Sequence, residues 1–244
     1  MRAIVCGACG RMGRVLRQMI NEALDWTLAA GVDPYGQAPE VLPSLELCPE
    51  ADVIIDFSHH SGTNALLAYA VEHALPVVIA TTGHTPEELA AIAEAAKKIP
   101  VFRSGNMSVG VALLCSLAKK TAAVFPEADI EIVETHHNRK LDVPSGTALT
   151  LAQAVQSVRP GSRLVIGRHE NGKRDVRDIG IHSLRMGNVV GVHEIHICTD
   201  TQTLTLRHEA HDRALFAEGA LQAAQYLVTK APGLYRVEDI LPLE

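Results

Sequence analysis

Short apolar runs alternate with stretches of helical spacing along the first part of the chain, and this alternation limits the possible folds most strongly. Five runs are apolar almost throughout: Ala3–Cys6, Trp26–Val32, Val53–Phe57, Pro76–Ala80 and Val101–Phe102. Three stretches between them repeat apolar residues at helical spacing: Arg11–Leu24, Thr63–His73 and Pro86–Lys98. Strands that are apolar along their whole length and are joined by helices predict an α/β fold, a Rossmann-like, doubly wound parallel sheet.

The pattern changes after about Asn106. A long apolar helix is expected over residues 108–125, followed by a strand over Asp129–Thr135 and a helix over Gly146–Ser157. Polar and apolar residues then alternate in three further runs: Ile181–Leu184, Asn188–Cys198 and Thr203–Ala210. This alternation predicts a second, mixed α/β region whose sheet has one open face, before a closing helix over Arg213–Leu227. The charged segment Gly167–Asp178 is interpreted as a solvated loop or a lid.

Composition excludes several classes of function. The formal net charge of -6 argues against a general nucleic-acid binder, which needs a surplus of Lys and Arg. Five cysteines in 244 residues do not form the even, dense set of a disulfide scaffold. No apolar run is long enough to cross a membrane, and the first run is interpreted as a core strand, not as a leader. We therefore expect a cytoplasmic protein.

A glycine-rich turn lies between the first strand and the first helix. Its glycines recur at every third position, Gly7, Gly10 and Gly13, with Ala8, Cys9, Arg11 and Met12 between them. Residues without a side chain allow a tight turn and let a pyrophosphate approach the backbone at the helix N-terminus. The turn therefore predicts a dinucleotide site, and an ordinary strand-to-helix turn is the alternative.

Asp33 ends the second strand, where a carboxylate accepts hydrogen bonds from the adenosine ribose. The same charge repels a 2′-phosphate, and the next residues, Pro34 and Tyr35, bring no compensating arginine. We expect NADH to be preferred, with NADPH tolerated through Arg11 or His59. Two later loops end strands of the same sheet and are expected to contact the nicotinamide and its ribose: Ala80, Thr81 and Thr82, and Ser104, Gly105, Asn106 and Met107.

The segment Glu131–Ala148 carries the densest polar chemistry. His136, His137 and Lys140 follow the strand over Asp129–Thr135, and Ser145-Gly146-Thr147 starts a helix. Cations and free N–H groups at a helix N-terminus favour an anionic substrate. A histidine exchanges protons near neutral pH. A polar surface loop before a capped helix is the alternative interpretation.

This segment resembles the signature of the dihydrodipicolinate reductase family, now called 4-hydroxy-tetrahydrodipicolinate reductase. The pattern E-x-x-E-x-H-H-x-x-K-x-D-x-P-S-G-T-A is matched throughout by Glu131–Ala148. Shorter stretches along the rest of the chain are also similar to the family: Gly7–Gly13, Ile55–Ser58, Thr81–Gly83, Asn106–Gly110 and Arg213–Ala217.

The resemblance implies an NADH- or NADPH-dependent oxidoreductase of lysine and diaminopimelate biosynthesis. It would reduce (2S,4S)-4-hydroxy-2,3,4,5-tetrahydrodipicolinate to 2,3,4,5-tetrahydrodipicolinate with loss of water. The resemblance assigns proton donor and acceptor chemistry to His136, a second proton donor to Lys140, and substrate carboxylate binding to His137, Gly146 and Thr147. It also implies a dinucleotide-binding domain over residues 1–107, to which 213–244 return, and a substrate and tetramerisation domain over 108–212.

Three other functions are weighed against this one. A semialdehyde or acyl-phosphate dehydrogenase of related architecture needs a nucleophilic cysteine, and Cys115 falls within an apolar helical pattern. The twelve histidines suggest a metal-binding protein as a second alternative. His193 and His196, however, are expected to point to opposite faces of a strand, and no metal is expected. A nucleotide sensor without catalysis does not need the His136–Lys140 segment.

Overall fold

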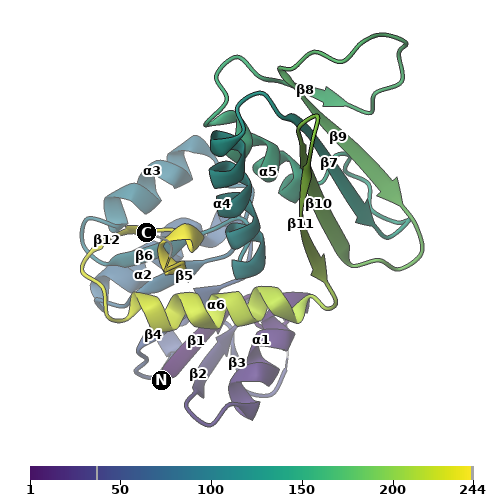
Figure 1. The fold of residues 1–244 in the computed structure, drawn as a ribbon. Coiled ribbons are helices and arrows are strands. Elements are labelled where there is room, and N and C mark those ends of the chain that lie inside the picture. The colour runs from purple at the N-terminus through teal and green to yellow at the C-terminus, as the bar shows by residue number, and fades with distance from the viewer. Residues whose placement is uncertain (37, 243–244) are drawn as a thin grey trace. The chain divides into compact units, whose positions relative to one another are not determined.

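The computed structural model describes residues 1–36 and 38–242 (Figure 1). Contacts divide the chain into two compact units, Met1–Val109 with Arg213–Glu244, and Gly110–Asp212. The roles of these units in binding nucleotide and substrate stay a prediction. Among the described residues, no helix combines the length and the apolar character needed to cross a membrane.

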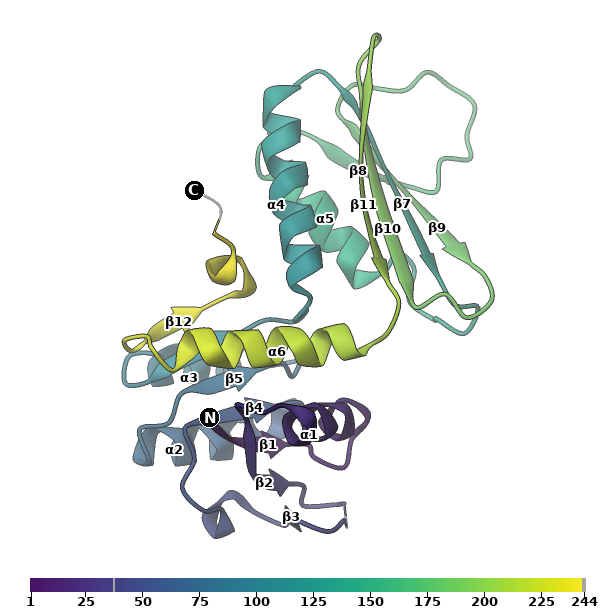
Figure 2. The same cartoon turned by 60° about the horizontal axis from the view of Figure 1, so that its bottom comes forward.

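The first unit is built on a parallel sheet with helices on both faces, which confirms the predicted fold (Figure 2). The strands run in the order β12-β6-β5-β4-β1-β2-β3. Their bounds are β1 Arg2–Cys6, β2 Thr27–Val32, β3 Val41–Leu42, β4 Val53–Asp56, β5 Val77–Ile79, β6 Pro100–Arg103 and β12 Gly233–Tyr235. The helices are α1 Arg11–Glu22, α2 Thr63–Glu72, α3 Pro86–Ala95 and α6 Ala214–Leu227, with 3₁₀ turns η1 Leu45–Leu47, η2 His60–Gly62 and η3 Val237–Ile240.

The central strands are buried on both faces, as their continuous apolar sequences predict. Ile4 and Val5 in β1, and Ile54 and Ile55 in β4, are all fully buried although neighbouring residues point to opposite faces. Helices α1 and α6 pack together, as do α2 and α3. Helix α3 begins as expected, with Pro86 in its first turn and a capping box between Thr85 and Glu88.

Strand order reverses between β1 and β4, and this reversal determines where a ligand can bind. From β1 the chain proceeds to β2 and β3 on one side, whereas β4, β5 and β6 extend the sheet on the other side. Loops that leave adjacent strands in opposite directions open a crevice at the carboxyl ends of those strands. A dinucleotide site is therefore expected at the ends of β1 and β4.

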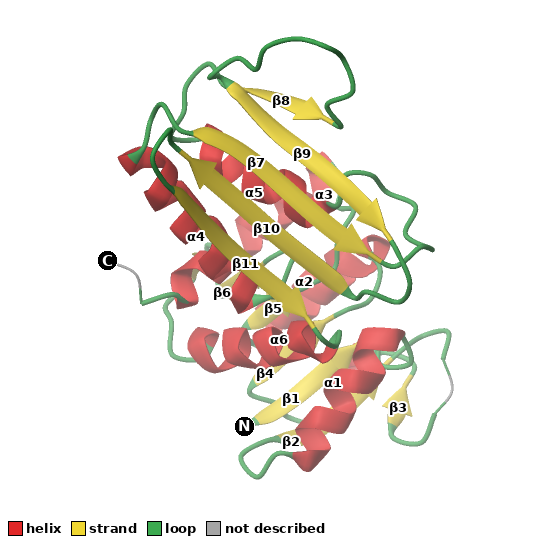
Figure 3. Cartoon of the chain, turned by 45° about the vertical axis from the view of Figure 1, so that its right-hand side comes forward, coloured by secondary structure: helices red, strands yellow, loops and turns green. Residues whose placement is uncertain are grey.

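The second unit is a five-stranded mixed sheet in the order β11-β10-β7-β9-β8, as the alternating pattern predicted. Its elements are α4 Val109–Val124, β7 Asp129–His136, α5 Gly146–Gln156, β8 Arg163–Ile166, β9 Asp178–Arg185, β10 Gly191–Cys198 and β11 Thr203–Ala210. Figure 3 shows α4 and α5 behind one face of this sheet and the other face uncovered. The core between helices and sheet includes Ile130, Ile132 and Ile195, all fully buried.

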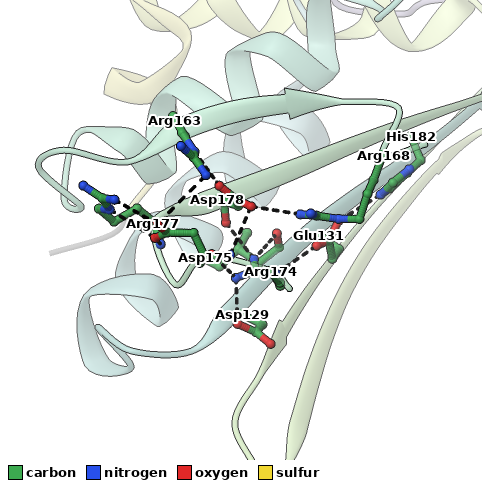
Figure 4. A network of polar contacts seen from close by, with 10 residues as sticks. Asp129, Glu131, Arg163, Arg168, Arg174, Asp175, Arg177, Asp178 and His182 are labelled. Atoms are coloured by element: carbon green, nitrogen blue, oxygen red, sulfur yellow. Dashed lines mark hydrogen bonds and ion pairs between the residues drawn. The ribbon is translucent and has the colours of Figure 1, made fainter. Parts of the chain in front are cut away.

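The loop between β8 and β9 is anchored by Arg174 (Figure 4). The Arg174 guanidinium donates to the carboxylates of Asp129 and Glu131 in β7, and to the carbonyl oxygens of Ile130 and Asp178. Asp178 is itself buried and pairs with Arg163 of β8 and with Arg168 at the start of the loop. The carboxyl-terminal half of the predicted loop is therefore fastened to the sheet, and Asp178 already belongs to β9.

Candidate functional site

A groove of about 510 Å³ lies at the reversal of strand order in the first unit. Its walls are the residues that follow three strands: Gly7 and Gly10 after β1, Asp33 and Tyr35 after β2, and Ser58 after β4. Segments far apart in sequence therefore meet at one edge of the sheet. This is the place that the topology predicts for a dinucleotide.

The glycines of the first turn are required by close backbone contacts. Gly7 has a φ of +73°, and a Cβ there would stand 2.6 Å from the carbonyl oxygen of Phe57. A Cβ on Gly13 would stand 2.1 Å from the carbonyl oxygen of Gly7. The turn thus folds over the start of α1. The N-cap of this helix is Gly10, which has no side chain to bond the first backbone N–H groups. The backbone N–H groups at this helix start fit a pyrophosphate.

The carboxylate of Asp33 lies beside the same turn. Its Oδ2 accepts a hydrogen bond from the backbone N–H of Cys9 at 3.0 Å. Its Oδ1 accepts from the backbone N–H groups of Tyr35 and Gly36 at 3.1 Å and 2.9 Å. Asp33 therefore both shapes its own loop and holds the glycine-rich turn. Because a carboxylate oxygen has two lone pairs, Oδ2 retains one for a ribose hydroxyl.

The other predicted cofactor loops also end strands of this sheet, after β5 and β6. Thr81 is buried and directs its hydroxyl into the protein, whereas Thr82 is exposed. The Ser104 hydroxyl donates to the carbonyl oxygen of Asn106 at 2.6 Å, which closes a tight turn. Met107 is buried, and its carbonyl oxygen would stand 1.7 Å from a Cβ on Gly219 of α6. The side chains of Thr81 and Met107 are therefore not exposed to a ligand at the surface of this unit.

In the second unit, polar residues replace apolar ones at the end of the helix-covered face of β7. Ile130 and Ile132 are followed on the same face by Glu134 and His136, both buried. The Nδ1 atom of His136 lies 2.5 Å from Oε2 of Glu134. Since a carboxylate only accepts, Nδ1 carries the hydrogen and Nε2 is the ring nitrogen left to exchange a proton.

Glu134 is held as an anion by several donors. Arg185, at the end of β9, donates through two guanidinium nitrogens at 2.9 Å and 2.8 Å, and the backbone N–H of Ser145 donates at 3.2 Å. Burial raises the pKa of Glu134, but hydrogen bonds from Arg185 and His136 outweigh it and lower this pKa to about 2. Burial also lowers the pKa of His136, against the raising effect of Glu134.

A second buried histidine connects this pair to the start of α5. The Nε2 of His193 in β10 lies 3.0 Å from the hydroxyl oxygen of Ser145, and its ring centre lies 5.1 Å from that of His136. The Ser145 hydroxyl also accepts from the backbone N–H of Ala148, so it is the N-cap of α5. Gly146 follows it, with open space where a Cβ would be. Burial lowers the pKa of His193 to about 4, so this ring is neutral at neutral pH.

The predicted cations lie just beyond β7. The Nζ of Lys140 is 2.9 Å from Oδ2 of Asp142, and the lysine side chain is 21% exposed. His137 is half-buried, and its carbonyl oxygen accepts from the backbone N–H of Lys140 at 3.1 Å. His137, Lys140 and the N-terminus of α5 therefore come from one continuous segment of the second unit.

Sequence reasoning did not assign a role to Glu134, Arg185 or His193. Glu134 had a signal, because a residue two positions before His136 on a strand shares its face. Arg185 and His193 are brought to the site by strand register, in which Arg185 lies opposite His136 and His193 lies opposite Glu134. No local pattern in a single sequence indicates such pairs.

The competing interpretations gain no support from the structure. Cys115 is buried in α4 within the apolar core, away from the position of an exposed nucleophile. Within residues 1–36 and 38–242, no three His, Cys, Asp or Glu side chains are grouped so as to hold a metal ion. His193 and His196 do lie on opposite faces of β10.

Known proteins resemble this chain over nearly its whole length. Models of the N-terminus and C-terminus of dihydrodipicolinate reductase match residues 1–107 and 110–241. The 4-hydroxy-tetrahydrodipicolinate reductase of Caldanaerobacter subterraneus subsp. tengcongensis is 43% identical, over 99% of this chain and 98% of that protein. That of Alkaliphilus metalliredigens is 41% identical over 100% of both chains.

A solved structure agrees with these relatives. Dipicolinate-bound dihydrodipicolinate reductase from Paenisporosarcina sp. TG-14 has a TM-score of 0.84 and 27% identity, and the match covers 99% of both chains. The chain therefore belongs to the dihydrodipicolinate reductase family.

Proposed function

We propose that this chain reduces 4-hydroxy-tetrahydrodipicolinate to tetrahydrodipicolinate with loss of water, in lysine and diaminopimelate biosynthesis. The observation that carries the proposal is the buried Glu134–His136 pair beside the N-terminus of α5. A proton-exchanging group next to a helix N-terminus suits an anionic substrate that must be protonated as it is reduced. The family and its relatives, all named for this reductase activity, support the same substrate.

The substrate carboxylates would bind at the segment after β7. The backbone N–H groups of Gly146 and Thr147 start α5, and the helix dipole favours negative charge there. His137 and Lys140 add hydrogen-bond donors from the loop that precedes the helix. The solved reductase structure from Paenisporosarcina sp. TG-14 holds dipicolinate, a planar dicarboxylate, which supports a dicarboxylate site in this chain.

His136 would deliver the proton through Nε2. Glu134 fixes the Nδ1–H tautomer and stabilises the imidazolium, while Arg185 keeps Glu134 ionised. Because burial lowers the pKa of His136, its protonated form readily gives up the proton near neutral pH. Lys140, partly exposed and paired with Asp142, is the second proton donor.

A reduced nicotinamide dinucleotide would bind the groove of the first unit and supply the hydride. The glycine-rich turn Gly7–Gly13 would hold its pyrophosphate, and the backbones of Ala80–Thr82 and Ser104–Met107 would contact the nicotinamide end. Asp33 would accept from the adenosine ribose and repel a 2′-phosphate. NADH is therefore the preferred cofactor, and NADPH a weaker one.

The open face of the second sheet is proposed as the contact of a homotetramer. Its polar and apolar side chains, among them Val133, Glu194 and His196, lie on the side of the sheet opposite to α4 and α5. None of the five cysteines, all of which the structure describes, forms a disulfide, which suits the reducing cytoplasm.

A coupled assay tests the activity. Substrate would be generated by the condensing synthase that precedes the reductase, and loss of NADH absorbance would be followed. We expect turnover by the parent and a fall of roughly 10²–10⁴-fold in His136→Gln, with little change in NADH affinity. Cys115→Ser is the matched control and should retain turnover. Full activity of His136→Gln, or loss of activity in Cys115→Ser with its fold intact, would contradict the proposal and favour a cysteine-dependent dehydrogenase.

A further inference from the structure

Asp56 is a buried carboxylate that the proposed reaction does not use. It ends β4, beside the reversal of strand order, and is 1% exposed. Its Oδ2 accepts the hydroxyl of Thr81 at 2.7 Å, and its Oδ1 accepts the backbone N–H of Ser58 at 3.0 Å. Burying a carboxylate away from water costs free energy. A buried carboxylate that only filled space could therefore be replaced by an apolar residue without loss of stability.

The two hydrogen bonds of Asp56 lead to two loops, and one of these loops packs against a third. Thr81 belongs to the loop after β5, and Ser58 belongs to the loop after β4. The third loop is the glycine-rich turn after β1, because a Cβ on Gly7 would stand 2.6 Å from the carbonyl oxygen of Phe57 and 2.8 Å from Cα of Ser58. The segment held by Asp56 is therefore the surface against which the glycine turn packs.

Two of these loops, the glycine-rich turn and the Thr81 loop, are expected to contact the pyrophosphate and the nicotinamide, and Ser58 of the third loop lines the groove. We propose that Asp56 is a positioning residue for the dinucleotide, which acts through Thr81 and Ser58 and sets the spacing between the glycine turn and the Thr81 loop. This inference rests on the proposed use of a nicotinamide cofactor. The hydroxyl of Thr81 is directed at Asp56 and is buried, so its effect on the cofactor runs through the backbone of its loop.

Substitutions at Thr81 and Asp56 distinguish positioning from packing. Thr81→Val has almost the same shape but lacks the hydroxyl, and Thr81→Ser keeps it. We expect Thr81→Val to raise the dissociation constant of NADH about tenfold, as for loss of a hydrogen bond to a charged group, and Thr81→Ser to stay close to the parent. Asp56→Ala should weaken NADH binding at least as much as Thr81→Val does. The double variant Asp56→Ala/Thr81→Val should bind NADH little more weakly than Asp56→Ala alone.

The matched control is Asp52→Asn, at the other end of β4. Asp52 is partly exposed and pairs with Arg2 at the opposite end of the sheet from the groove, so its loss should leave NADH binding unchanged. NADH binding would be titrated by the fluorescence of the bound nicotinamide, dipicolinate binding by calorimetry, and folding by thermal unfolding without ligand. Positioning predicts weaker NADH binding with unchanged dipicolinate affinity.

Each outcome bears on the inference. If Thr81→Val binds NADH as tightly as the parent does, Asp56 does not position the cofactor. The same conclusion follows if the losses of NADH affinity in Asp56→Ala and Thr81→Val add up in the double variant. Equal losses of NADH and dipicolinate affinity would show general destabilisation and would also overturn the inference. Turnover by the parent in the coupled assay separates these results from failure of the proposed function, because an inactive parent that binds no NADH would overturn both.

Discussion

Oε2 of Glu134 lies 2.5 Å from Nδ1 of His136, two positions along the same face of β7. Both side chains are buried, and Arg185 donates two hydrogen bonds to the carboxylate. The pair resembles the carboxylate–histidine arrangement by which enzymes fix one tautomer of an imidazole. The chemistry proposed for His136 therefore depends on a neighbour that is itself fully buried.

Removing the charge of Glu134 should impair proton transfer. In Glu134→Gln the amide no longer stabilises the imidazolium, so kcat should fall about 10²-fold. The carboxylate raises the pKa of His136, so the pH above which kcat declines should move to lower values in the variant. A pH profile of kcat checks this, with the exposed Glu127→Gln as control. An unchanged profile would exclude Glu134 as the partner of the proton donor.

Gly191 leaves space beside the reactive nitrogen of His136. A Cβ at this position would stand 3.1 Å from Nε2 of His136 and 3.8 Å from Cε1 of His193. In Gly191→Ala the imidazole must move or lose access to substrate, and kcat should fall roughly tenfold, which corresponds to about 1.4 kcal/mol of barrier. Steady-state kinetics and a melting curve check this. Parental kcat at an unchanged melting temperature would show that Nε2 does not face the substrate.

The buried His193 should make stability depend on pH. Its pKa falls to about 4 in the folded protein, from 6.5 in the unfolded chain. The unfolded state therefore binds more protons between these values, and stability present at pH 7 is lost as pH falls from about 6.5 toward 4. This histidine should remove about 2 kcal/mol of unfolding free energy between pH 7 and pH 5.

Urea unfolding at pH 7 and pH 5, followed by circular dichroism, checks that difference. His193→Leu should lose less stability over this interval than the parent, and the exposed His169→Leu should lose the same amount as the parent. Equal pH dependence in all three proteins would mean that His193 titrates alike in the folded and unfolded states.

Asp33 should determine the cofactor preference. Asp33→Ala removes a ribose acceptor and the repulsion of a 2′-phosphate together, so NADH affinity should fall roughly tenfold while NADPH affinity falls less or rises. Titration of the protein with each cofactor measures the ratio of the NADH and NADPH dissociation constants. The matched control is Asp25→Ala, which precedes β2. A larger loss of NADPH affinity than of NADH affinity would show that Asp33 does not bind the adenosine ribose.

Long elements and the buried central strands were predicted from the sequence, whereas three short edge strands were missed. Strands such as β1 and β7, and helices such as α3 with its Thr85 cap, show clear periodicity or capping signals. Strands β3, β8 and β12 contain between two and four residues and show no periodicity of their own, because they exist through pairing with a neighbouring strand. Strand β9 begins at Asp178, inside the predicted loop, because its charge is neutralised by Arg163 and Arg168.

The site was predicted in part, for a related reason. His136, Lys140 and the Ser145 helix start are close in sequence, so the segment itself indicated them. Arg185, His193 and Gly191 reach His136 only through the pairing of β7 with β9 and β10. Asp56 and Thr81 likewise meet because β4 and β5 are neighbours in the sheet. Chemistry that depends on register is not visible in one sequence.

Helix α6 and strand β12 complete the first unit although they come last in the chain. Gly219 lets α6 lie against the carbonyl of Met107, and β12 pairs with the edge strand β6. During synthesis, the ribosome therefore releases the whole second unit before the first can be completed. Until then the nascent chain exposes the apolar face that α6 covers over β4–β6, together with an unpaired sheet edge. The protein is thus prone to aggregation until the segment that follows the second unit has been made.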